Sequence, residues 1–429
     1  MKKSDRAIAV SVLSEILDEG AYANIALRKA LAESGLSSQS RAFVTELVNE
    51  TVRNLLLIDC IIESFSSSPA SEMKPFIRNV LRIAICQIRF LERIPERAAV
   101  DEAVKLTKAQ GFGRLSGFVN AILRSITREP QKPEYSQKDM AMRFSYPPWL
   151  VNSLVKWLGS KGAIEFCENS HKPAPVTILT NTLKTDMISL TKLLEGEGVE
   201  VIQPQIDATV EDFPMLVLSR TGDITRLKAF REGHFIVADP GSMAAVHALS
   251  ANPGQTIIDL CAAPGGKSFA TAFHMRDKGR ILACDIHPHK MELLKQTQKR
   301  LGLTVIEPIL NDAQVFNPRM QHIADAVLLD APCSGLGTIR KHPEIKYNRT
   351  PEDIQFLSKK QALMLSMAMN YVKSGGILVY CTCTVSSEEN MDVINDFIAA
   401  NSDFTLEYSQ QTLPSLTSDG FFTAKLRRS

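Results

Sequence analysis

The spacing of apolar residues divides the chain into regions with different predicted secondary structure. Across residues 4–128 apolar positions recur every three to four residues, as at Ile8, Val12 and Ile16, and this period predicts amphipathic helices. We therefore expect an all-α domain here. The stretch 128–139 that follows is polar and contains two prolines, which indicates a connector rather than a helix interior.

A second pattern begins after this connector. Helical character returns at 140–159, and between Pro173 and Asp239 short apolar runs alternate with two polar helical stretches around Leu190 and Leu227. The order strand, helix, strand, strand, helix, strand is that of a small ferredoxin-like α/β module. We expect its strands in the segments TILTN, VEVIQP, MLVLSR and HFIVAD.

After Pro253 apolar runs of strand length are separated by longer helical segments. The runs are TIIDL, RILACD, VIEPIL, AVLLD and GILVYCTC. Near-continuous apolar strands are typical of a parallel sheet that helices cover on both faces. The sequence thus predicts an all-α domain at 1–140, linker helices and the small module at 141–238, and a doubly wound α/β domain at 239–429.

Two places in the α/β part have the spacing of a helix start. Thr350 and Asp353 are a capping residue and an acid three positions later, with Pro351 at the first helical position. Ser386 and Glu389 repeat the spacing of a capping box. We therefore expect a helix to begin at each place.

Composition is that of a globular protein with a mildly basic N-terminal part. The 429 residues are 45% hydrophobic and 22% charged, with a net charge of +2, and these values exclude a disordered chain. Residues 1–145 hold 21 Lys and Arg against 17 Asp and Glu. That excess fits either a surface that binds a phosphate backbone or an ordinary solvated helix face.

The N-terminus and the cysteines indicate where the protein acts. The chain begins like a signal peptide, but Glu15, Asp18 and Glu19 interrupt the apolar stretch. No run reaches the roughly 18 apolar residues of a membrane-spanning helix. Eight cysteines are too few for a disulfide scaffold in so long a chain. We expect a cytoplasmic protein, outside the membrane, with reduced thiols.

A glycine-containing turn joins the first strand of the α/β part to a helix. The segment 256–270, TIIDLCAAPGGKSFA, runs strand, turn, helix, which directs backbone N–H groups toward a ligand above the sheet. A nucleotide-like cofactor is the usual occupant. Gly266, Lys267 and Ser268 resemble the end of a P-loop, but the first glycine of that motif would fall on Cys261. This spacing excludes a Walker nucleotide site.

Acidic residues follow three successive strands. Asp285 ends the second strand, where a carboxylate can accept hydrogen bonds from the ribose hydroxyls of a nucleoside, and Asp312 follows the third, near an adenine edge. Asp330 ends the fourth strand. A single acid of this kind is more often a helix cap or a loop residue. Three at successive strand ends favour a binding site.

Thiols follow the fourth and fifth strands. Cys333 comes after the fourth, and Cys381 and Cys383 end the fifth. A lone buried cysteine is more often a small hydrophobic residue than a nucleophile, but thiols at two neighbouring strand ends favour catalysis. Because successive strand residues point to opposite faces, we expect only one of Cys381 and Cys383 to face the site.

A second group of possible ligands lies after the second strand. Cys284, His287 and His289 straddle a strand end and a helix that starts with proline, without a second ligand pair at zinc-finger spacing. We therefore expect structural roles for these residues and no metal.

Three motifs in the right order are similar to those of a known family. DLCAAPGGKS, DAPCSGLGTIRKHPEIKY and VYCTCTVSSEEN resemble the cofactor, proline-cysteine and threonine-cysteine motifs of the Sun/Fmu RNA (cytosine-5)-methyltransferases. Upstream, EAVKLTKAQGFGRLSGFVNAILR is similar to a NusB-type RNA-binding domain. The resemblance covers essentially the whole chain, although the family usually has glutamine at Ala238, and LPSLTSDG is short.

The resemblance implies a fold, a cofactor and a reaction. The expected fold is an all-α NusB-like domain, a ferredoxin-like module and a Rossmann-like methyltransferase domain. The expected reaction transfers a methyl group from S-adenosylmethionine to C5 of a cytosine in 16S rRNA, free or in an assembling small subunit, by a monomeric enzyme. The implied cofactor-binding residues are Cys261, Ala262, Ala263, Pro264, Gly265, Gly266, Lys267, Asp285, Asp312 and Asp330.

The resemblance also implies catalytic roles. Cys383 is the expected nucleophile, because a thiolate that adds to C6 makes C5 reactive toward a methyl group. Asp330 is suited to bind the ring at N3 and its amino group. Cys333 is expected to help remove the C5 proton and expel Cys383, and Lys267 is expected to favour a thiolate.

The target base must leave any stack before a thiol can reach C6. Arg340, Lys341 and His342 follow the proline-cysteine motif, and the resemblance favours RNA contact over a solvated loop for them. We expect them to hold the phosphates that flank the flipped base.

Two alternatives remain. A DNA cytosine-5 enzyme would keep the fold but would carry its nucleophile in the proline-cysteine motif. An RNA-binding transcription or assembly factor would use the NusB-like domain and keep a non-catalytic methyltransferase domain. The acids and thiols at the strand ends are all present, which favours the enzyme. These residues are Asp285, Asp312, Asp330, Cys333 and Cys383.

Overall fold

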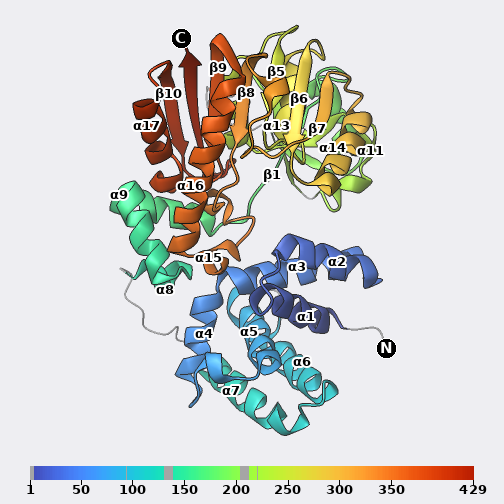
Figure 1. Cartoon of the computed structure of the whole chain (residues 1–429). Helices are drawn as coiled ribbons and strands as arrows, with labels where there is room; N and C mark the ends of the chain where they lie inside the picture. The colour runs from blue at the N-terminus through green and yellow to red at the C-terminus, as the bar shows by residue number, and fades with distance from the viewer. Residues whose placement is uncertain (1–3, 93, 130–138, 203–211, 220) are drawn as a thin grey trace. The chain divides into compact units, whose positions relative to one another are not determined.

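The chain folds into two compact units. The computed structural model describes residues 4–92, 94–129, 139–202, 212–219 and 221–429. The first unit comprises the residues up to His171 together with Lys341–Asn348, and the second comprises Lys172–Arg340 and Arg349–Ser429. Figure 1 shows the elements of both units.

The first unit is helical, which confirms the predicted all-α region. Its apolar stripes face inward, so that Val12, Leu13 and Ile16 are fully buried. The described helices are α1 (Asp5–Leu17), α2 (Ala23–Glu33), α3 (Ser38–Arg53), α4 (Leu55–Ser64), α5 (Pro75–Phe90), α6 (Glu96–Ala109), α7 (Ser116–Arg128), α8 (Met140–Phe144), α9 (Pro148–Ser170) and α15 (Ile345–Asn348). Most of the predicted connector at 128–139 lies outside the described residues.

The short segment that contains α15 completes this unit from late in the chain. The buried ammonium of Lys346 donates to the carbonyl oxygens of Arg53 at 2.8 Å and Phe144 at 3.3 Å, the last residues of α3 and α8. Buried Glu344 accepts the backbone amide of Ala23, the first residue of α2, at 3.1 Å. Each side chain thus meets a helix end that favours its charge, which offsets part of the cost of burial. For Lys346 burial still lowers the pKa well below its usual value.

The second unit begins with a four-stranded antiparallel sheet of order β2-β3-β1-β4. This order confirms the predicted ferredoxin-like module. Asn181 fastens the module to the larger sheet's helix layer by donating to the carbonyl oxygens of Gly233 at 2.9 Å and Leu301 at 3.1 Å. The elements are β1 (Val176–Thr180), α10 (Met187–Gly196), β2 (Glu200–Ile202), β3 (Met215–Ser219), α11 (Lys228–Arg231) and β4 (Phe235–Val237).

The larger sheet of this unit has seven strands in the order β10-β11-β9-β8-β5-β6-β7. The five predicted strands are parallel, whereas β10 and β11 form an antiparallel edge that the sequence pattern did not predict. The strands are β5 (Thr256–Asp259), β6 (Arg280–Asp285), β7 (Ile306–Leu310), β8 (Ala324–Asp330), β9 (Val372–Thr382), β10 (Phe404–Thr412) and β11 (Phe421–Arg428).

Helices cover both faces of this sheet. Residues of α12, α13 and α14 pack with one set of strand residues, and residues of α16 and α17 pack with the alternate set. This double cover explains why the parallel strands are apolar on both faces. The helices are α12 (Pro240–Leu249), α13 (Gly266–His274), α14 (Pro288–Leu301), α16 (Pro351–Ala368) and α17 (Met391–Ala400).

The two predicted helix starts have different outcomes. Thr350 and Asp353 form a complete capping box at the start of α16. At the second place the prediction was wrong, because only a short 3-10 turn, Ser387–Glu389, follows Ser386, and α17 starts at Met391. No described helix is long and apolar enough to cross a membrane.

His171 gives the first unit a pH-dependent stability. Burial, followed by the nearby charges of Lys346 and Arg53, lowers the pKa of His171 from 6.5 to about 3. The folded state therefore binds fewer protons than the unfolded state between about pH 3 and pH 6.5, and stability falls as the pH drops through this window.

We predict that His171→Gln reduces the acid sensitivity of the protein. The wild type should lose roughly 2 kcal/mol more unfolding free energy than the variant between pH 7 and pH 5. Urea unfolding followed by circular dichroism at both pH values measures this difference. His289→Gln, at an exposed histidine, is the control and should follow the wild type. Equal pH dependence in the wild type and His171→Gln would contradict the assignment.

Candidate functional site

The turn between β5 and α13 forms one wall of a pocket. Gly265 has φ +113°, and a Cβ there would lie 2.3 Å from the ring of Phe269, so this turn requires glycine. Helix α13 begins at the next residue. The pocket has a volume of about 200 Å³, and its lining includes Ala262, Ala263, Pro264, Gly266, Lys267, Asp239, Asp259 and Asp330. The predicted cofactor turn therefore borders a cavity.

The predicted acids lie along one edge of the sheet. Asp285 ends β6 and is 7% exposed, and its Oδ1 accepts the amide of His287 at 2.9 Å. Asp312 follows β7, and Asp330 ends β8. Because β5 to β8 are parallel, their carboxyl ends share this edge. Ligands of open α/β sheets bind outside such ends.

An ion pair occupies the centre of this edge. The Lys267 ammonium donates to Asp330 Oδ2 at 2.6 Å, and the Lys267 side chain is 13% exposed. Burial alone would lower the pKa of Lys267, but Asp330 and the neighbouring thiols Cys381 and Cys383 together raise it. Lys267 therefore stays cationic and presents its charge to these thiols.

The structure brings the two predicted catalytic thiols together. The Sγ atoms of Cys333 and Cys383 lie 3.3 Å apart and share a hydrogen bond. Their loops are braced, because Gly337 N donates to Cys383 O at 2.9 Å. A Cβ at Gly337 would lie 2.0 Å from Gly420 O, so only glycine fits there. The hydrogen bond with Cys383, then burial, raises the pKa of Cys333, which holds it as a thiol at neutral pH.

The prediction that only one of Cys381 and Cys383 faces the site was wrong. Cys381 Sγ lies 3.4 Å from Asp330 Oδ1, so both thiols lie beside Asp330 and Lys267. Residues two positions apart on a strand share a face, and this pair is separated by two positions. Cys381 is fully buried, whereas Cys383 is partly exposed. Exposure, rather than the face of the strand, distinguishes them.

The predicted phosphate contact by Arg340 was also wrong. Its side chain is 1% exposed, and its Nε donates to Asp419 Oδ1 at 2.6 Å. A second nitrogen donates to Ser415 O at 2.6 Å. The guanidinium therefore holds the loop before β11 instead of facing solvent. Lys341 and His342 belong to the first unit.

Sequence reasoning missed one buried acid at the same edge. Asp259 ends β5 and is 2% exposed. Burial raises its pKa to about 7, even though Ser268 Oγ donates to its Oδ2 at 2.6 Å. The signal that identified the other acids, a carboxylate at the end of a parallel strand, could have found it.

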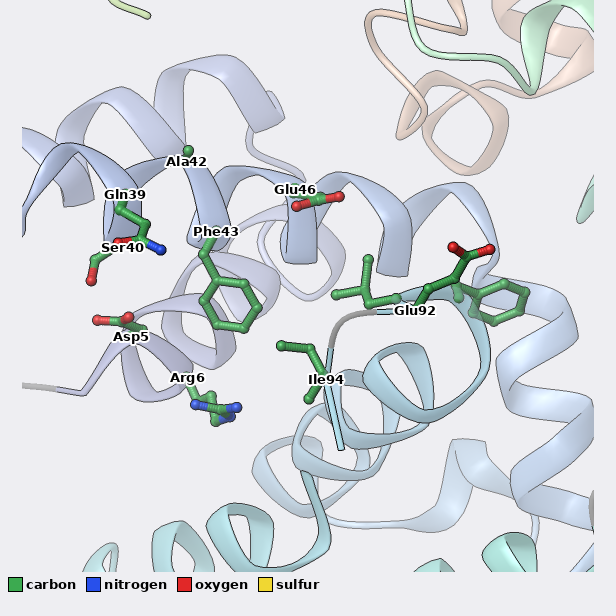
Figure 2. A pocket seen from close by; sticks show the side chains of 11 residues that line it. Asp5, Arg6, Gln39, Ser40, Ala42, Phe43, Glu46, Glu92 and Ile94 are labelled. Carbon is green, nitrogen blue, oxygen red and sulfur yellow. The ribbon is translucent and has the colours of Figure 1, made fainter. Parts of the chain in front are cut away.

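A pocket of about 920 Å³ lies in the first unit (Figure 2). Phe43 points into it, and the Arg6 guanidinium stands over that ring at 5.3 Å. Three carboxylates also line it, those of Asp5, Glu46 and Glu92. No predicted site residue borders this pocket, and its acids do not suit a phosphate backbone. Among the described residues, no group of three or more His, Cys, Asp or Glu side chains is arranged so that it could hold a metal ion.

The short distance between Cys333 and Cys383 predicts a reversible disulfide. The sulfurs need to approach by roughly 1.3 Å to reach disulfide length. Oxidised glutathione should accept the two electrons, so that one protein disulfide and two molecules of reduced glutathione form. Mass spectrometry should find one intact chain lighter by two hydrogens, with a peptide that joins both residues. Dithiothreitol should reverse the change. Cys60 is the reference thiol, and stable glutathione adducts on Cys333 and Cys383 without a cross-link would contradict the geometry.

Known proteins match all parts of the chain. Residues 246–427 match the family described as 16S rRNA methyltransferase RsmB/F, residues 3–128 match the NusB family, and residues 146–210 match the RsmF/B-like ferredoxin-like domain. These matches confirm the family and the fold that the three motifs predicted.

Full-length relatives give the same result. The chain is 34% identical to the probable ribosomal RNA small subunit methyltransferase B of Bacillus subtilis, covering 100% of this chain and 99% of the relative. It is 31% identical to ribosomal RNA small subunit methyltransferase B of Thermus thermophilus, covering 99% and 97%. The crystal structure of PH0851 matches over 100% of both chains, with 26% identity and a TM-score of 0.83. The chain therefore belongs to the 16S rRNA methyltransferase RsmB/F family and is an rRNA methyltransferase with a NusB-family N-terminal region.

Proposed function

We propose that the enzyme transfers a methyl group to C5 of a cytosine in 16S rRNA through a covalent bond between Cys383 and C6. The observation that carries this proposal is the pair of sulfurs 3.3 Å apart, Cys333 and Cys383, beside the ion pair of Lys267 and Asp330. The names of the full-length relatives support the substrate, since they are small-subunit rRNA methyltransferases.

The residues at the sheet edge fit S-adenosylmethionine, which supplies an electrophilic methyl group when bound. Asp285 offers a carboxylate at the end of β6 for ribose hydroxyls, and Asp312 lies after the next strand, where an adenine edge is expected. Gly266 lines the pocket and has open space where a Cβ would stand, which supports close approach of the backbone to a ligand. We assign binding to Cys261, Ala262, Ala263, Pro264, Gly265, Gly266, Lys267, Asp285, Asp312 and Asp330.

Cys383 is proposed as the nucleophile, because cytosine C5 is too weak a nucleophile to take a methyl group unaided. When a thiolate adds to C6, electron density moves to C5 and N3. Cys383 is partly exposed, whereas Cys381 is buried, so of these two Cys383 is accessible to a base. Lys267 remains a cation, paired with Asp330, beside this thiol, and we assign it a supporting catalytic role.

Cys333 is proposed to act in release. After methylation the C5 proton must leave, and its bonding electrons must re-form the C5–C6 double bond as Cys383 departs as a thiolate. The hydrogen bond with Cys383 and burial raise the pKa of Cys333, so its thiol must first lose its proton to solvent. The thiolate that remains is then a strong enough base to take the C5 proton. Asp330, ionised beside Lys267, is suited to accept a hydrogen bond from the cytosine amino group and, once N3 has taken up a proton from solvent, a second one from N3–H.

The rest of the chain is proposed to bind the RNA. We assign RNA capture to residues 1–140 and to the module within 141–238, since residues 3–128 match the NusB family. The catalytic domain then spans 239–429. A monomer in the cytoplasm is the simplest form that this arrangement supports, and either free rRNA or an assembling subunit is a suitable substrate.

Substitution of the two cysteines tests the proposed mechanism. We expect Cys383→Ala to lose methyl transfer from labelled S-adenosylmethionine to unmodified 16S rRNA, because the nucleophile is absent. Cys333→Ala should form a covalent protein–RNA complex that survives denaturing electrophoresis, because release is blocked. The wild type should methylate and release.

The control for the cysteine experiment is Cys60→Ala, a partly exposed thiol in α4 of the first unit. It should keep wild-type activity. Full activity in Cys383→Ala would contradict the proposed mechanism and would indicate that Cys333 is the nucleophile. Absence of methyl transfer by the wild type, with RNA binding retained, would instead favour a non-catalytic RNA-binding factor.

Substitution of Asp285 tests the cofactor site. Asp285→Asn removes a charge that accepts ribose hydroxyls, so the Kd for S-adenosylmethionine should rise roughly tenfold. Isothermal titration calorimetry measures this Kd without RNA. Asp396→Asn, an exposed acid on α17, is the matched control. An unchanged Kd in Asp285→Asn would remove Asp285 from the cofactor site.

A further inference from the structure

A buried carboxylate lies behind the two catalytic cysteines. Glu389 ends the 3-10 turn Ser387–Glu389 and is 0% exposed. Its sequence position suggested a capping acid for a helix that starts at Ser386. Instead, its side chain turns inward and accepts hydrogen bonds from another loop. Burial of a carboxylate costs folding free energy unless hydrogen-bond donors compensate it. The donors around Glu389 therefore show what this side chain holds in place.

Ser334 and Gln361 provide those donors. Glu389 Oε1 accepts the backbone amide of Ser334 at 2.8 Å and Gln361 Nε2 at 3.0 Å, and its Oε2 accepts the Ser334 hydroxyl. Three donors on one side chain fit an ionised carboxylate, which only accepts. Burial raises the pKa of Glu389, and the hydrogen bonds from Ser334 oppose that shift.

The same contacts extend to the loop of the second cysteine. Ser334 Oγ lies 2.8 Å from Thr384 Oγ1. Because the Ser334 hydroxyl has one proton and gives it to Glu389, Thr384 donates to Ser334. Ser334 follows Cys333, and Thr384 follows Cys383. One carboxylate therefore fixes the residue that follows each thiol.

Two neighbouring side chains, Gln361 and Asn390, also form hydrogen bonds with the two cysteine loops. Gln361 Nε2 also donates to Pro332 O at 2.9 Å, which holds the residue before Cys333. Asn390 Nδ2 donates to Thr384 O at 3.1 Å, and Asn390 Oδ1 accepts Thr382 Oγ1 at 2.6 Å. The two residues Glu389 and Asn390 thus contact both loops directly or through one hydroxyl.

We infer that Glu389 is a positioning residue that sets the spacing of the Cys333 and Cys383 sulfurs through Ser334 and Thr384. The inference concerns geometry, but its effect on methyl transfer rests on the proposed function. The carboxylate accepts hydrogen bonds from two groups of the single residue Ser334. It therefore fixes the orientation of that loop as well as the distance between the loop and Glu389. Small errors in the placement of reacting groups cost large factors in rate.

The substitution Glu389→Gln tests this role. The amide oxygen can still accept the backbone amide of Ser334, but the amide N–H group then faces the Ser334 hydroxyl, which must accept it and turn its own proton toward Thr384. Two readouts are needed. The first is the equilibrium between the thiol pair and its disulfide in mixtures of reduced and oxidised glutathione, which measures the effective concentration of one sulfur at the other. The second is kcat and KM for methyl transfer to 16S rRNA.

We expect the equilibrium constant for disulfide formation to fall about tenfold in Glu389→Gln, since the charged acceptor is lost and the hydrogen bond between Ser334 and Thr384 must reverse. The value of kcat should fall roughly 10- to 100-fold, with KM for S-adenosylmethionine within about twofold of wild type. Glu388→Gln, at the adjacent partly exposed acid, is the matched control and should leave both readouts at wild-type values.

A second variant covers a failure of Glu389→Gln to fold. Thr384→Val keeps the shape but removes the hydroxyl that joins the second loop to Ser334, and it should change both readouts in the same direction. Wild-type disulfide equilibrium and kcat in either folded variant would overturn the inference. So would a lower unfolding midpoint with both readouts unchanged. If the wild type methylates no RNA, the proposed function fails, and the glutathione equilibrium alone decides the spacing role.

Discussion

The chemistry of this enzyme depends on the parallel pairing of β8 with β9. In that register Asp330 lies opposite Cys381, so both strands end at the same level of the sheet. The loops beyond them therefore need only a few residues to bring Cys333 and Cys383 within 3.3 Å of each other. A slip of one residue would turn every side chain of a strand to the other face. The register thus decides which groups meet, and the loops then adjust their spacing.

The parts of the fold that the sequence predicted are those in which burial dictates composition. The parallel strands bury both faces, so neighbours such as Val327 and Leu328 pack into different clusters, and the whole run must be apolar. β10 instead alternates partly buried and exposed residues at the sheet edge, and its polar positions made the sequence look like a loop. Strand-end acids were predictable for a similar reason, because parallel strands bring their ends together wherever they lie in the chain.

The side-chain partners were harder to predict, because they come from distant residues. Thr350 bonds its predicted partner three positions away, at an exposed helix start. Glu389 had the same spacing from Ser386, but it is buried and finds its donor 55 positions earlier, at Ser334. Arg340 similarly pairs with Asp419, 79 positions later. Local spacing identifies which groups need partners, whereas tertiary packing selects the partners.

The segment Lys341–Asn348 has a consequence for how the enzyme is made. This segment supplies Lys346 and Glu344, which meet helix ends in the first unit. The ribosome must synthesise all of residues 172–340 between His171 and this segment. At about 5 to 20 residues per second this takes roughly 8 to 34 s. The helical unit therefore emerges first but becomes complete only after most of the second unit has been translated, so the maturation of one part awaits the synthesis of the other.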